Sequence, residues 1–332
     1  MTNDKPRVLV TPTTLKGIDG PFLEVLRAGG LEIVFPPRTA QLIESELLED
    51  LKGISATLAG SEPYTRRILE SAPALRVIAR AGVGYDAVDV TAATAHGIAV
   101  TTTPGTNQDS VAEHTFALIL ALAKDIIASD RTTRSGGWSR EPNLPLRGRV
   151  LGIAGLGRIG KAVALRGAAF GMPLLAYEPF PDQAFVKQLG VTLVPLEKLL
   201  AESDYLSLHV PLTPESRHMI NRRTLALMKP TAFLINTARG GLVKEADLVD
   251  ALRNRRIAGA GLDVFEQEPP GSRSLLDLDN LVLTPHMAGV DLQSRDDMAL
   301  HAARAIVALY RGEWPTPQIV NPEVRAKFRW VE

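Results

Sequence analysis

The chain contains no cysteine in 332 residues. This absence excludes disulfide bonds, thiolate nucleophiles and cysteine-ligated zinc, and it is typical of a protein in a reducing compartment. Net charge is also missing, because 37 basic residues balance 37 acidic ones. A balanced chain has no bulk electrostatic attraction to nucleic acid or to a membrane surface. We therefore expect neither as a partner.

Long apolar runs are absent as well. The most apolar helical stretch, near Phe116–Ala123, is far shorter than the ~20 residues that span a bilayer. Residues Met1–Arg7 are polar and lead directly into a short predicted strand, so no secretory signal is visible. No spacing of His, Asp or Glu resembles a metal site, and there is no internal repeat. These absences predict a cytoplasmic protein that binds no metal.

What the chain does contain is an alternation of short apolar runs with helix-compatible stretches. Its length favours two domains over one. Five strands are predicted in the first hundred residues: Val8–Val10, Glu32–Phe35, Ala56–Ala59, Arg76–Ala79 and Ile98–Val100. Six more are predicted after Arg149, near 149–154, 173–177, 205–208, 232–236, 257–262 and 281–284. Alternation of this kind predicts two parallel α/β sheets, and six strands make a complete dinucleotide-binding sheet.

The segment between the two alternations begins at Thr101–Gly105, whose Pro and Gly break the pattern. A long helix is expected next, started by a capping box of Ser110 and Glu113 and apolar as far as Ile127. A helix that is apolar on more than one face is usually buried between domains or against another subunit. The Gly- and Pro-rich segment that follows is long enough to be a functional arm. Trp138 within it is either a partner-facing anchor or a locally packed side chain.

The motif Gly155-Leu-Gly-Arg-Ile-Gly160 follows an apolar run and precedes the helix-compatible stretch 161–170. In this setting Gly155 makes the tight turn, and Gly157 lets the backbone approach a pyrophosphate. Gly160 lets the helix pack closely on the strand. The phosphates would bind the free N–H groups at the start of that helix. The motif therefore predicts a dinucleotide site in the middle of the chain.

A carboxylate supports this interpretation. The next apolar run ends at Glu178, close to the ~20-residue offset of the acid that binds the ribose hydroxyls of the adenosine. A carboxylate there would repel a 2′-phosphate, so NAD is favoured over NADP. The alternative is a solvent-facing Glu at a strand end.

A second segment, Gly82–Ala87, also fits the glycine pattern. Asp86 and Asp89 would repel a pyrophosphate bound there. The next apolar run ends without an acid that could bind a ribose. This loop is therefore not the dinucleotide site, but its backbone N–H groups can still bind a small anion such as a carboxylate.

Ligands of an open parallel sheet bind beyond the carboxyl ends of its strands. The residues that follow the third to sixth strands of the second alternation are polar and include His209, Arg239, Asp263, Glu268 and His286. We expect an Arg, a carboxylate and a His to converge at this edge, where a nicotinamide would lie. His114 is a further candidate for the same region, whereas His218 is expected at the surface.

Each of these residue types has a task in hydride transfer at a carbinol carbon. A His can remove the hydroxyl proton near neutral pH, since its free pKa is about 6.5. A carboxylate on the other ring nitrogen fixes the tautomer and raises that pKa. An Arg binds a substrate carboxylate bidentately. The set therefore indicates a 2-oxo or 2-hydroxy carboxylate, although a structural His, a helix-capping Arg and a surface-loop Glu would each explain one residue singly.

Four signatures in order resemble the D-isomer-specific 2-hydroxyacid dehydrogenase family: Gly155-Leu-Gly-Arg-Ile-Gly160, Asn236-Thr-Ala-Arg-Gly240, Asp263-Val-Phe-x-x-Glu-Pro269 and Thr284-Pro-His286. Ala81–Asp86 and Ser110–His114 agree, so the resemblance spans essentially the whole chain.

The resemblance implies roles for individual residues. His286 would be the general acid/base, Glu268 its partner and Arg239 the clamp on the substrate carboxylate and carbonyl. Substrate binding would also involve Val83, Gly84 and Asn107. The implied cofactor contacts are Gly155, Gly157, Arg158, Ile159, Gly160, Glu178, His209, Val210, Thr237, Ala238, Asp263, His286 and Gly289.

The resemblance also implies two doubly wound parallel-sheet domains. Residues 1–103 and 291–332 would form a flavodoxin-like substrate domain, into which a Rossmann NAD-binding domain of residues 104–290 is inserted. Family members are usually homodimers built around the long helix and its arm.

Substrate identity depends on the loop 58–63, which is expected to face the far end of the substrate. Glu62 stands there, where phosphoglycerate-type members tend to offer an arginine. Small acids such as glyoxylate or hydroxypyruvate are therefore preferred, with 3-phosphoglycerate as the alternative. A formate dehydrogenase is disfavoured, because that branch carries Gln in place of Glu268. A NAD-sensing corepressor is disfavoured by the short termini of this chain.

Overall fold

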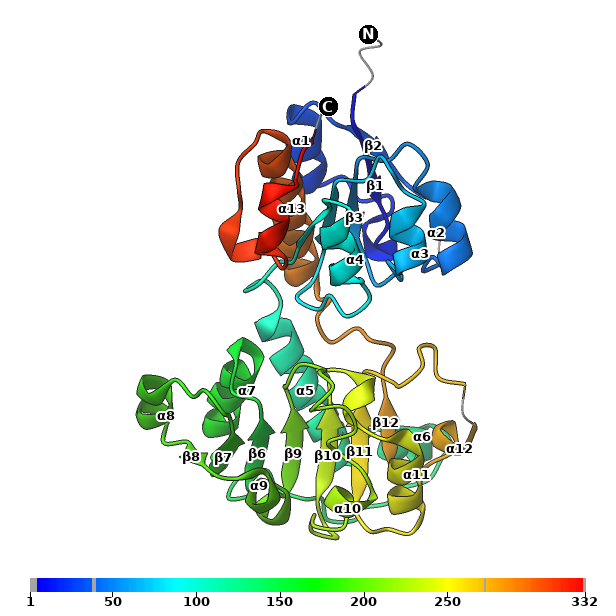
Figure 1. Cartoon of the computed structure of the whole chain (residues 1–332). Coiled ribbons are helices and arrows are strands. Elements are labelled where there is room, and N and C mark those ends of the chain that lie inside the picture. The colour runs from blue at the N-terminus through cyan, green and yellow to red at the C-terminus, as the bar shows by residue number, and fades with distance from the viewer. Residues whose placement is uncertain (1–4, 38–39, 272, 331–332) are drawn as a thin grey trace. The chain divides into compact units, whose positions relative to one another are not determined.

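The structure is a computed structural model that describes residues 5–37, 40–271 and 273–330 (Figure 1). Residues 1–4 of the polar stretch in which no secretory signal was predicted lie outside these ranges. The chain divides into two compact units. Unit 1 comprises residues 1–107 and 290–332, and unit 2 comprises residues 108–289. Unit 2 is thus one continuous stretch, whereas unit 1 is assembled from both ends of the chain.

Unit 1 is built on a five-stranded parallel sheet in the order β2-β1-β3-β4-β5. The strands are β1 (Arg7–Val10), β2 (Glu32–Val34), β3 (Ala56–Ala59), β4 (Val77–Arg80) and β5 (Ala99–Thr101). The order 2-1-3-4-5 is that of flavodoxin-like sheets. Every residue of β3 and β4 is buried, as expected of central parallel strands covered on both faces.

Helices cover both faces of this sheet. One face packs against α1 (Pro21–Ala28) and α13 (Leu292–Tyr310), which belong to one apolar cluster with β1 and β3. The opposite face packs against α2 (Glu44–Asp50), α3 (Arg66–Glu70) and α4 (Val90–Ala95). The short 3-10 helices of the unit are η1 (Thr13–Leu15), η3 (Thr316–Gln318) and η4 (Pro322–Ala326). Since α13 supplies a large part of the core, unit 1 is incomplete without the C-terminal segment.

Unit 2 is built on a seven-stranded parallel sheet in the order β12-β11-β10-β9-β6-β7-β8. The strands are β6 (Leu151–Ala154), β7 (Leu174–Tyr177), β8 (Thr192–Leu193), β9 (Tyr205–Leu208), β10 (Phe233–Asn236), β11 (Gly259–Leu262) and β12 (Leu281–Leu283). Counted from β6, this is the 3-2-1-4-5-6 order of dinucleotide-binding sheets with one further strand at the β12 edge. Six strands were predicted. The strand that was missed is β8, which is too short to produce a recognisable apolar pattern.

Two layers of helices enclose the sheet of unit 2 (Figure 1). One layer contains α5 (Gln108–Ala123), α7 (Arg158–Ala169) and α8 (Gln183–Leu189). The other contains α9 (Leu196–Glu202), α10 (Arg222–Leu225), α11 (Glu245–Arg253) and α12 (Arg273–Leu276). The short 3-10 helix η2 (Gly240–Leu242) follows β10.

Two expectations about the long helix were wrong. Ser110 does not cap it, because α5 already begins at Gln108 and the Ser110 hydroxyl donates to the carbonyl of Ala288 (2.8 Å). The helix also does not continue to Ile127. Asp125, at φ +49°, separates α5 from a second helix, α6 (Ile126–Arg134). The apolar pattern runs across this break, so the pattern alone concealed it.

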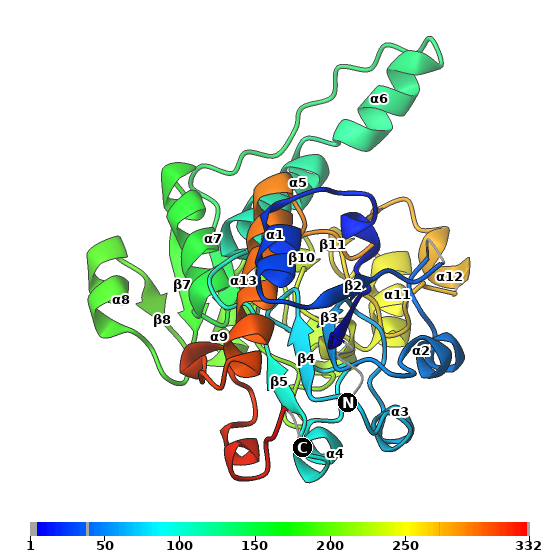
Figure 2. The same ribbon diagram turned by 90° about the horizontal axis from the view of Figure 1, so that it is seen from above.

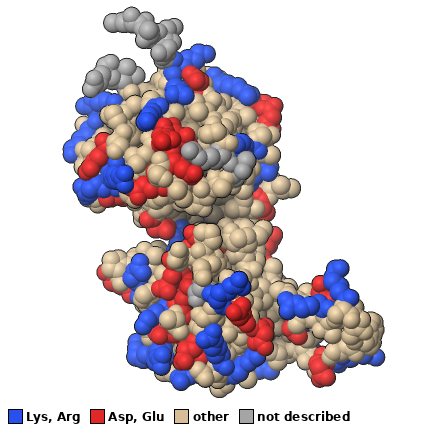
Figure 3. Space-filling model, turned by 90° about the vertical axis from the view of Figure 1, so that its right-hand side faces the viewer, with Lys and Arg blue, Asp and Glu red and all other residues tan. Residues whose placement is uncertain are grey.

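Helix α6 has no buried residue and projects, with the segment that follows it, away from the sheet of unit 2 (Figure 2). Trp138 in that segment is 82% exposed, so it is not packed locally within the chain. Basic and acidic side chains are interspersed on the face shown in Figure 3. None of the described helices combines the length and the hydropathy of a transmembrane span.

Candidate active site

The glycine loop connects β6 to α7. Gly155 has φ +93°, and a Cβ added there would lie 2.6 Å from the carbonyl oxygen of His209. A Cβ on Gly160 would overlap the carbonyl oxygen of Gly155. Gly157 is the N-cap of α7, and a Cβ there would meet no protein atom within 4 Å. The turn and the packing of the helix explain the outer two glycines, while the open space at Gly157 suits a pyrophosphate at the helix N-terminus.

Glu178 follows β7 and is bonded to this loop. Its Oε2 accepts a hydrogen bond from the N–H of Leu156 (2.8 Å), and its Oε1 accepts one from the N–H of Phe180 (3.0 Å). The carboxylate is therefore held beside the glycine loop rather than extended into solvent. A ribose diol can bind at such a carboxylate, and a 2′-phosphate would meet a fixed negative charge.

His209 and Val210 follow β9 and lie against the glycine loop. A Cβ on Gly155 would also come within 2.9 Å of the Val210 nitrogen. The His209 ring bonds to the Ser207 hydroxyl through Nε2 (2.8 Å). Burial lowers the pKa of His209 to about 3. His209 is therefore neutral at physiological pH and adds no positive charge to the dinucleotide site.

His286 and Glu268 form a hydrogen-bonded pair after β12 and β11. The distance from His286 Nδ1 to Glu268 Oε2 is 2.6 Å, and both side chains are just over a third exposed. Glu268 Oε1 accepts a further bond from the N–H of Phe265 (3.1 Å). Burial acts to raise the pKa of Glu268, but the bond and charge of His286, the Phe265 N–H and the charge of Arg239 lower it overall. The acid is thus ionised at neutral pH and fixes the His286 tautomer.

Arg239 follows β10 and is half-buried. Its Nη1 donates to the carbonyl of Ala238 (2.6 Å), and its own carbonyl accepts a bond from the Asn236 side chain (2.8 Å). A Cβ on Gly240 would overlap the backbone of Phe265, so this loop packs directly on the segment that carries Glu268. The structure thus brings the Arg, the carboxylate and the His to one edge of the sheet, as the rule about strand ends predicted.

Asp263, for which the resemblance implies a cofactor contact, is bonded to the loop that follows β12. Its side chain is fully buried. Oδ1 accepts bonds from the Thr284 hydroxyl (2.6 Å) and the Met287 N–H (2.9 Å), and Oδ2 accepts one from the Ala288 N–H (2.8 Å). The N–H of His286 donates to the Asp263 carbonyl (2.8 Å). Asp263 therefore fixes the segment that carries His286 and ends at Gly289.

Helix α5 supports the same segments through its polar side chains. His114 Nε2 lies 2.9 Å from the Thr284 hydroxyl, which is itself bonded to Asp263. The hydroxyls of Thr115 and Thr237 are 3.0 Å apart. His114 thus acts on the loop after β12, which the sequence suggested only in general terms.

In unit 1 the loop with Val83 and Gly84 is held on both sides. Arg80 Nε donates to the carbonyl of Gly84 (3.0 Å). Gly82 exchanges two bonds with Thr103, from its N–H to the hydroxyl and from the Thr103 N–H to its carbonyl, each 3.0 Å long. The loop is therefore fixed by its own hydrogen bonds. Asn107 is buried at the end of this part of unit 1.

Glu62 is buried, so it does not offer the exposed acid from which a preference against a phosphate was predicted. The residue is only 2% exposed. Its carboxylate accepts bonds from the Thr11 hydroxyl and the Gly60 N–H (2.9 Å). Burial raises the pKa of Glu62, although the backbone N–H groups of Glu62 and Gly60 and the charge of Arg80 oppose the shift. The sequence could not reveal this, because Thr11 follows a different strand, 51 residues away from Glu62.

His218 is likewise not an isolated surface histidine. Its Nε2 lies 2.5 Å from Oε1 of Glu266, which is 48 residues away in the sequence. Proximity of this kind leaves no local sequence signal.

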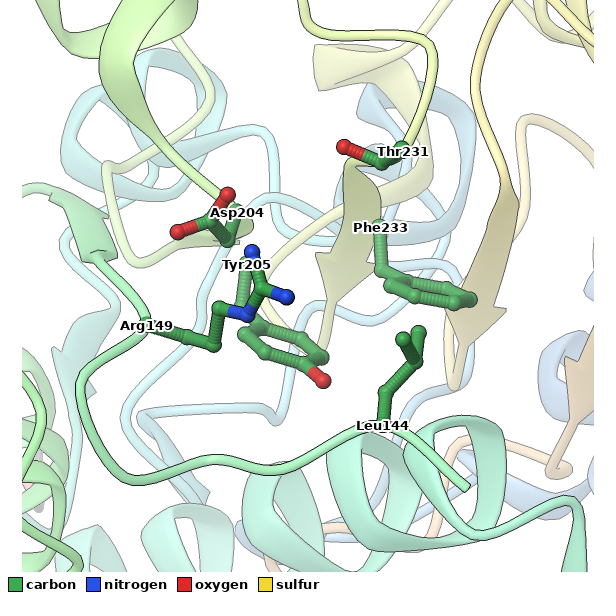
Figure 4. A pocket seen from close by; sticks show the side chains of 6 residues that line it. All are labelled: Leu144, Arg149, Asp204, Tyr205, Thr231 and Phe233. Carbon is green, nitrogen blue, oxygen red and sulfur yellow. The ribbon is translucent and has the colours of Figure 1, made fainter. Parts of the chain in front are cut away.

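One small cavity lies at the amino ends of β9 and β10, opposite the edge described above (Figure 4). It has a volume of about 60 Å³ and is lined by Leu144, Arg149, Asp204, Tyr205, Thr231 and Phe233. That volume accommodates a few water molecules and not a dinucleotide. Within residues 5–37, 40–271 and 273–330, no group of three or more His, Asp or Glu could hold a metal ion.

A complete dinucleotide sheet, a carboxylate at its glycine loop and a His–Glu pair beside an Arg define a nicotinamide-dependent oxidoreductase. The profile of the D-isomer specific 2-hydroxyacid dehydrogenase NAD binding domain matches residues 116–288. The glyoxylate reductase of Korarchaeum cryptofilum is 46% identical over 296 residues, which cover 87% of this chain and 88% of the relative. That of Pyrococcus furiosus is 44% identical over 86% of this chain and 87% of the relative. The chain belongs to the D-isomer-specific 2-hydroxyacid dehydrogenase family, and it is a nicotinamide-dependent oxidoreductase of that family.

Solved structures agree with this assignment. A protein from Thermus thermophilus superimposes with a TM-score of 0.85 at 39% identity, over 95% of this chain and 99% of its own. D-Lactate dehydrogenase from Aquifex aeolicus, solved with NAD and lactic acid, gives a TM-score of 0.83 at 31% identity, over 95% and 98% of the two chains. The D-3-phosphoglycerate dehydrogenase of Methanocaldococcus jannaschii is 42% identical over 85% of this chain, but the match covers only 55% of that relative.

Proposed function

We propose that this protein reduces a small unphosphorylated 2-oxo acid, such as glyoxylate or hydroxypyruvate, with NADH and catalyses the reverse oxidation. The observation that carries the proposal is the 2.6 Å pair of His286 and Glu268 beside Arg239. The glyoxylate reductases among its relatives support the substrate class.

The residues of unit 2 fit a dinucleotide. The open space at Gly157 and the N–H groups at the start of α7 suit its pyrophosphate. The cofactor supplies or accepts the hydride when it is bound. The residues that would hold it are Gly155, Gly157, Arg158, Ile159, Gly160, Glu178, His209, Val210, Thr237, Ala238, His286 and Gly289, with Asp263 as the support of the last two.

NAD is the cofactor that Glu178 favours over NADP. Both carboxylate oxygens are bonded to backbone N–H groups, which keeps the negative charge in place. A 2′-phosphate would have to displace or neutralise that charge.

The proton moves through His286. In the direction of reduction, Nε2 of the protonated ring donates to the carbonyl oxygen of the substrate, while Nδ1 stays bonded to Glu268. The Glu268 carboxylate stabilises the protonated ring and keeps it in one orientation from one turnover to the next. Arg239 binds the substrate carboxylate and polarises the adjacent carbonyl. In unit 1, the backbone N–H groups at Val83 and Gly84 and the side chain of Asn107 would bind the carboxylate as well.

3-Phosphoglycerate is the alternative substrate. The Methanocaldococcus relative favours it, and Glu62, being buried, does not argue against it. The test is a panel of glyoxylate, hydroxypyruvate, pyruvate and 3-phosphohydroxypyruvate, each with NADH and NADPH. We expect the highest kcat/KM for glyoxylate or hydroxypyruvate with NADH, and a preference for 3-phosphohydroxypyruvate would establish the alternative.

His286→Ala and Arg239→Ala test the mechanism with the preferred substrate of that panel. Each should lower kcat/KM by about two orders of magnitude or more, because each removes a group that acts in the transition state. A His286→Ala protein with full activity would contradict the mechanism but not the family.

We also propose a cytoplasmic homodimer. Ile126 and Ile127 of α6 are 54% and 45% exposed, and Trp138 is exposed as well. Such apolar side chains on a projecting arm suit a partner surface. Sedimentation analysis should give twice the mass of the chain, and a monomer would refute the dimer. Cell fractionation should place the protein in the cytoplasmic fraction.

A further inference from the structure

A second histidine–carboxylate pair lies next to the proposed catalytic pair and takes no part in the mechanism above. His218 Nε2 is 2.5 Å from Glu266 Oε1, and each side chain is about a third exposed. Glu266 precedes Glu268 by only two residues. The backbone of His218 is fixed at φ +54°, and its N–H donates to the carbonyl of Gly241 (2.8 Å).

Glu266 also bonds to the start of α11. Its Oε2 accepts a bond from the N–H of Glu245 (3.1 Å), and its own N–H donates to Oε1 of Glu245 (2.5 Å). The two residues are 21 positions apart and exchange reciprocal bonds. These two bonds attach the segment after β11 to the start of α11. The bond to His218 attaches it to the loop that precedes α10.

This segment carries Glu268 and packs against the loop of Arg239. The N–H of Phe265 donates to Glu268 Oε1, and the Phe265 backbone packs against Gly240, the neighbour of Arg239. A shift of segment 265–268 would therefore displace Glu268 from His286 and loosen the Arg239 loop together.

The negative charges around segment 265–268 repel one another, so loss of its hydrogen bonds would let the segment move. Three carboxylates lie close together, and the pKa of Glu245 is raised by burial and by the charges of Glu266 and Glu268. The opposing positive groups are Arg239 and, when protonated, the imidazoles of His218 and His286. Hydrogen bonds thus hold the carboxylates where electrostatic repulsion alone would separate them.

We propose that Glu266, held by His218 and Glu245, is a positioning residue for the hydride-transfer reaction, because it keeps segment 265–268 where Glu268 orients His286. This inference rests on the proposed roles of His286 and Glu268. Glu266 acts through the position of the segment, because its hydrogen bonds are to His218 and Glu245 rather than to a proposed catalytic residue.

The experiment measures reduction of glyoxylate, or of the best substrate of the panel, by Glu266→Ala across pH. We expect kcat to fall roughly tenfold, because small misplacements of catalytic groups have costs of this order and above. KM for NADH should stay within about twofold of the wild-type value. The fall in rate at high pH should begin at lower pH, since a displaced Glu268 stabilises the protonated His286 less well.

Matched variants separate positioning from folding. His218→Gln keeps a donor at the Nε2 position and should stay near wild type, whereas His218→Ala should lose part of kcat. Glu245→Gln keeps the acceptor oxygen and should retain more activity than Glu245→Ala. Glu202→Gln, which alters an exposed pair with Lys198 on α9, is the control and should change nothing.

Two results would overturn the inference. One is a Glu266→Ala protein whose kcat and pH profile match the wild type. The other is a Glu266→Ala protein whose activity falls only in proportion to its folded fraction, as measured by thermal unfolding, while its pH–rate profile stays unshifted. Failure of the proposed function would be distinguishable, because the wild-type protein would then reduce no substrate of the panel. Failure of the proposed mechanism would show as full activity in His286→Ala and Glu268→Gln, and the inference would fall with it.

Discussion

His286 adopts a backbone conformation that is uncommon for a residue other than glycine. Its φ is +53°, in the left-handed region. The His286 N–H donates to the carbonyls of Asp263 and Thr284, and the N–H groups of Met287 and Ala288 donate to the Asp263 carboxylate. These bonds hold His286 in that conformation. Strained backbone of this kind persists where the surroundings over-determine it, and it is common at functional sites. The buried acid therefore fixes the backbone of His286, the proposed acid/base.

At the residue scale, Glu268→Gln tests the acid that orients His286. The pKa of Glu268 is lowered, so the carboxylate is ionised throughout the neutral range and down to below its ordinary pKa. Neutralising it removes the charge that stabilises the protonated imidazole. We expect kcat for reduction to fall by about 10- to 100-fold and the high-pH fall of the rate to begin at lower pH. An unshifted pH–rate profile would contradict this role.

Glu178→Gln tests cofactor selection at the same scale. The neutral amide removes the fixed charge that opposes a 2′-phosphate but keeps one acceptor for the backbone. The ratio of kcat/KM for NADH to that for NADPH should fall by roughly tenfold, equivalent to about 1.4 kcal/mol. The variant Glu197→Gln, an exposed acid in the first turn of α9, serves as the control. A ratio that does not change would show that other groups select the cofactor.

At the scale of elements, the three glycines between β6 and α7 differ in what they require. A Cβ on Gly160 overlaps backbone, whereas one on Gly157 meets nothing in the protein. Gly160→Ala should therefore lower the free energy of unfolding by about 1–3 kcal/mol. Gly157→Ala should leave stability unchanged and raise KM for NADH at least several-fold, because the methyl group would enter the space of the pyrophosphate. Thermal unfolding measures the stability of both variants, and NADH titration of the rate measures their KM. Equal changes in the two variants would contradict the separate roles of Gly157 and Gly160.

At the scale of the whole molecule, the two units differ in how the chain builds them. Unit 2 is continuous and has apolar clusters on both faces of its sheet. We expect the isolated fragment 108–289 to unfold cooperatively on heating and to bind NADH. The fragment 1–107 should not fold, because it lacks α13, whose Ala302 and Ile306 are fully buried against unit 1. Circular dichroism melts and NADH fluorescence test both fragments, and an unfolded 108–289 would contradict the expectation.

Periodic and local features were predictable from sequence. Runs of apolar residues predicted all five strands of unit 1 and six of the seven in unit 2 to within about two residues. The convergence of Arg239, Glu268 and His286 followed from the general rule that ligands bind at the carboxyl ends of parallel strands. The break at Asp125 and the two-residue strand β8 were missed, because neither changes the apolar pattern enough to be read.

The sequence by itself determined the class of this protein. Glycines, a strand-end carboxylate and the Arg, Glu and His signatures depend on chain-local spacing, which folding preserves. Only the tertiary structure decided how the remaining polar residues are used: it buried Glu62 under its own loop, paired His218 with Glu266 and turned Asp263 into the support of His286. Those pairs are joined across 21 to 51 residues, where burial and hydrogen bonding, which no local spacing encodes, select the partner.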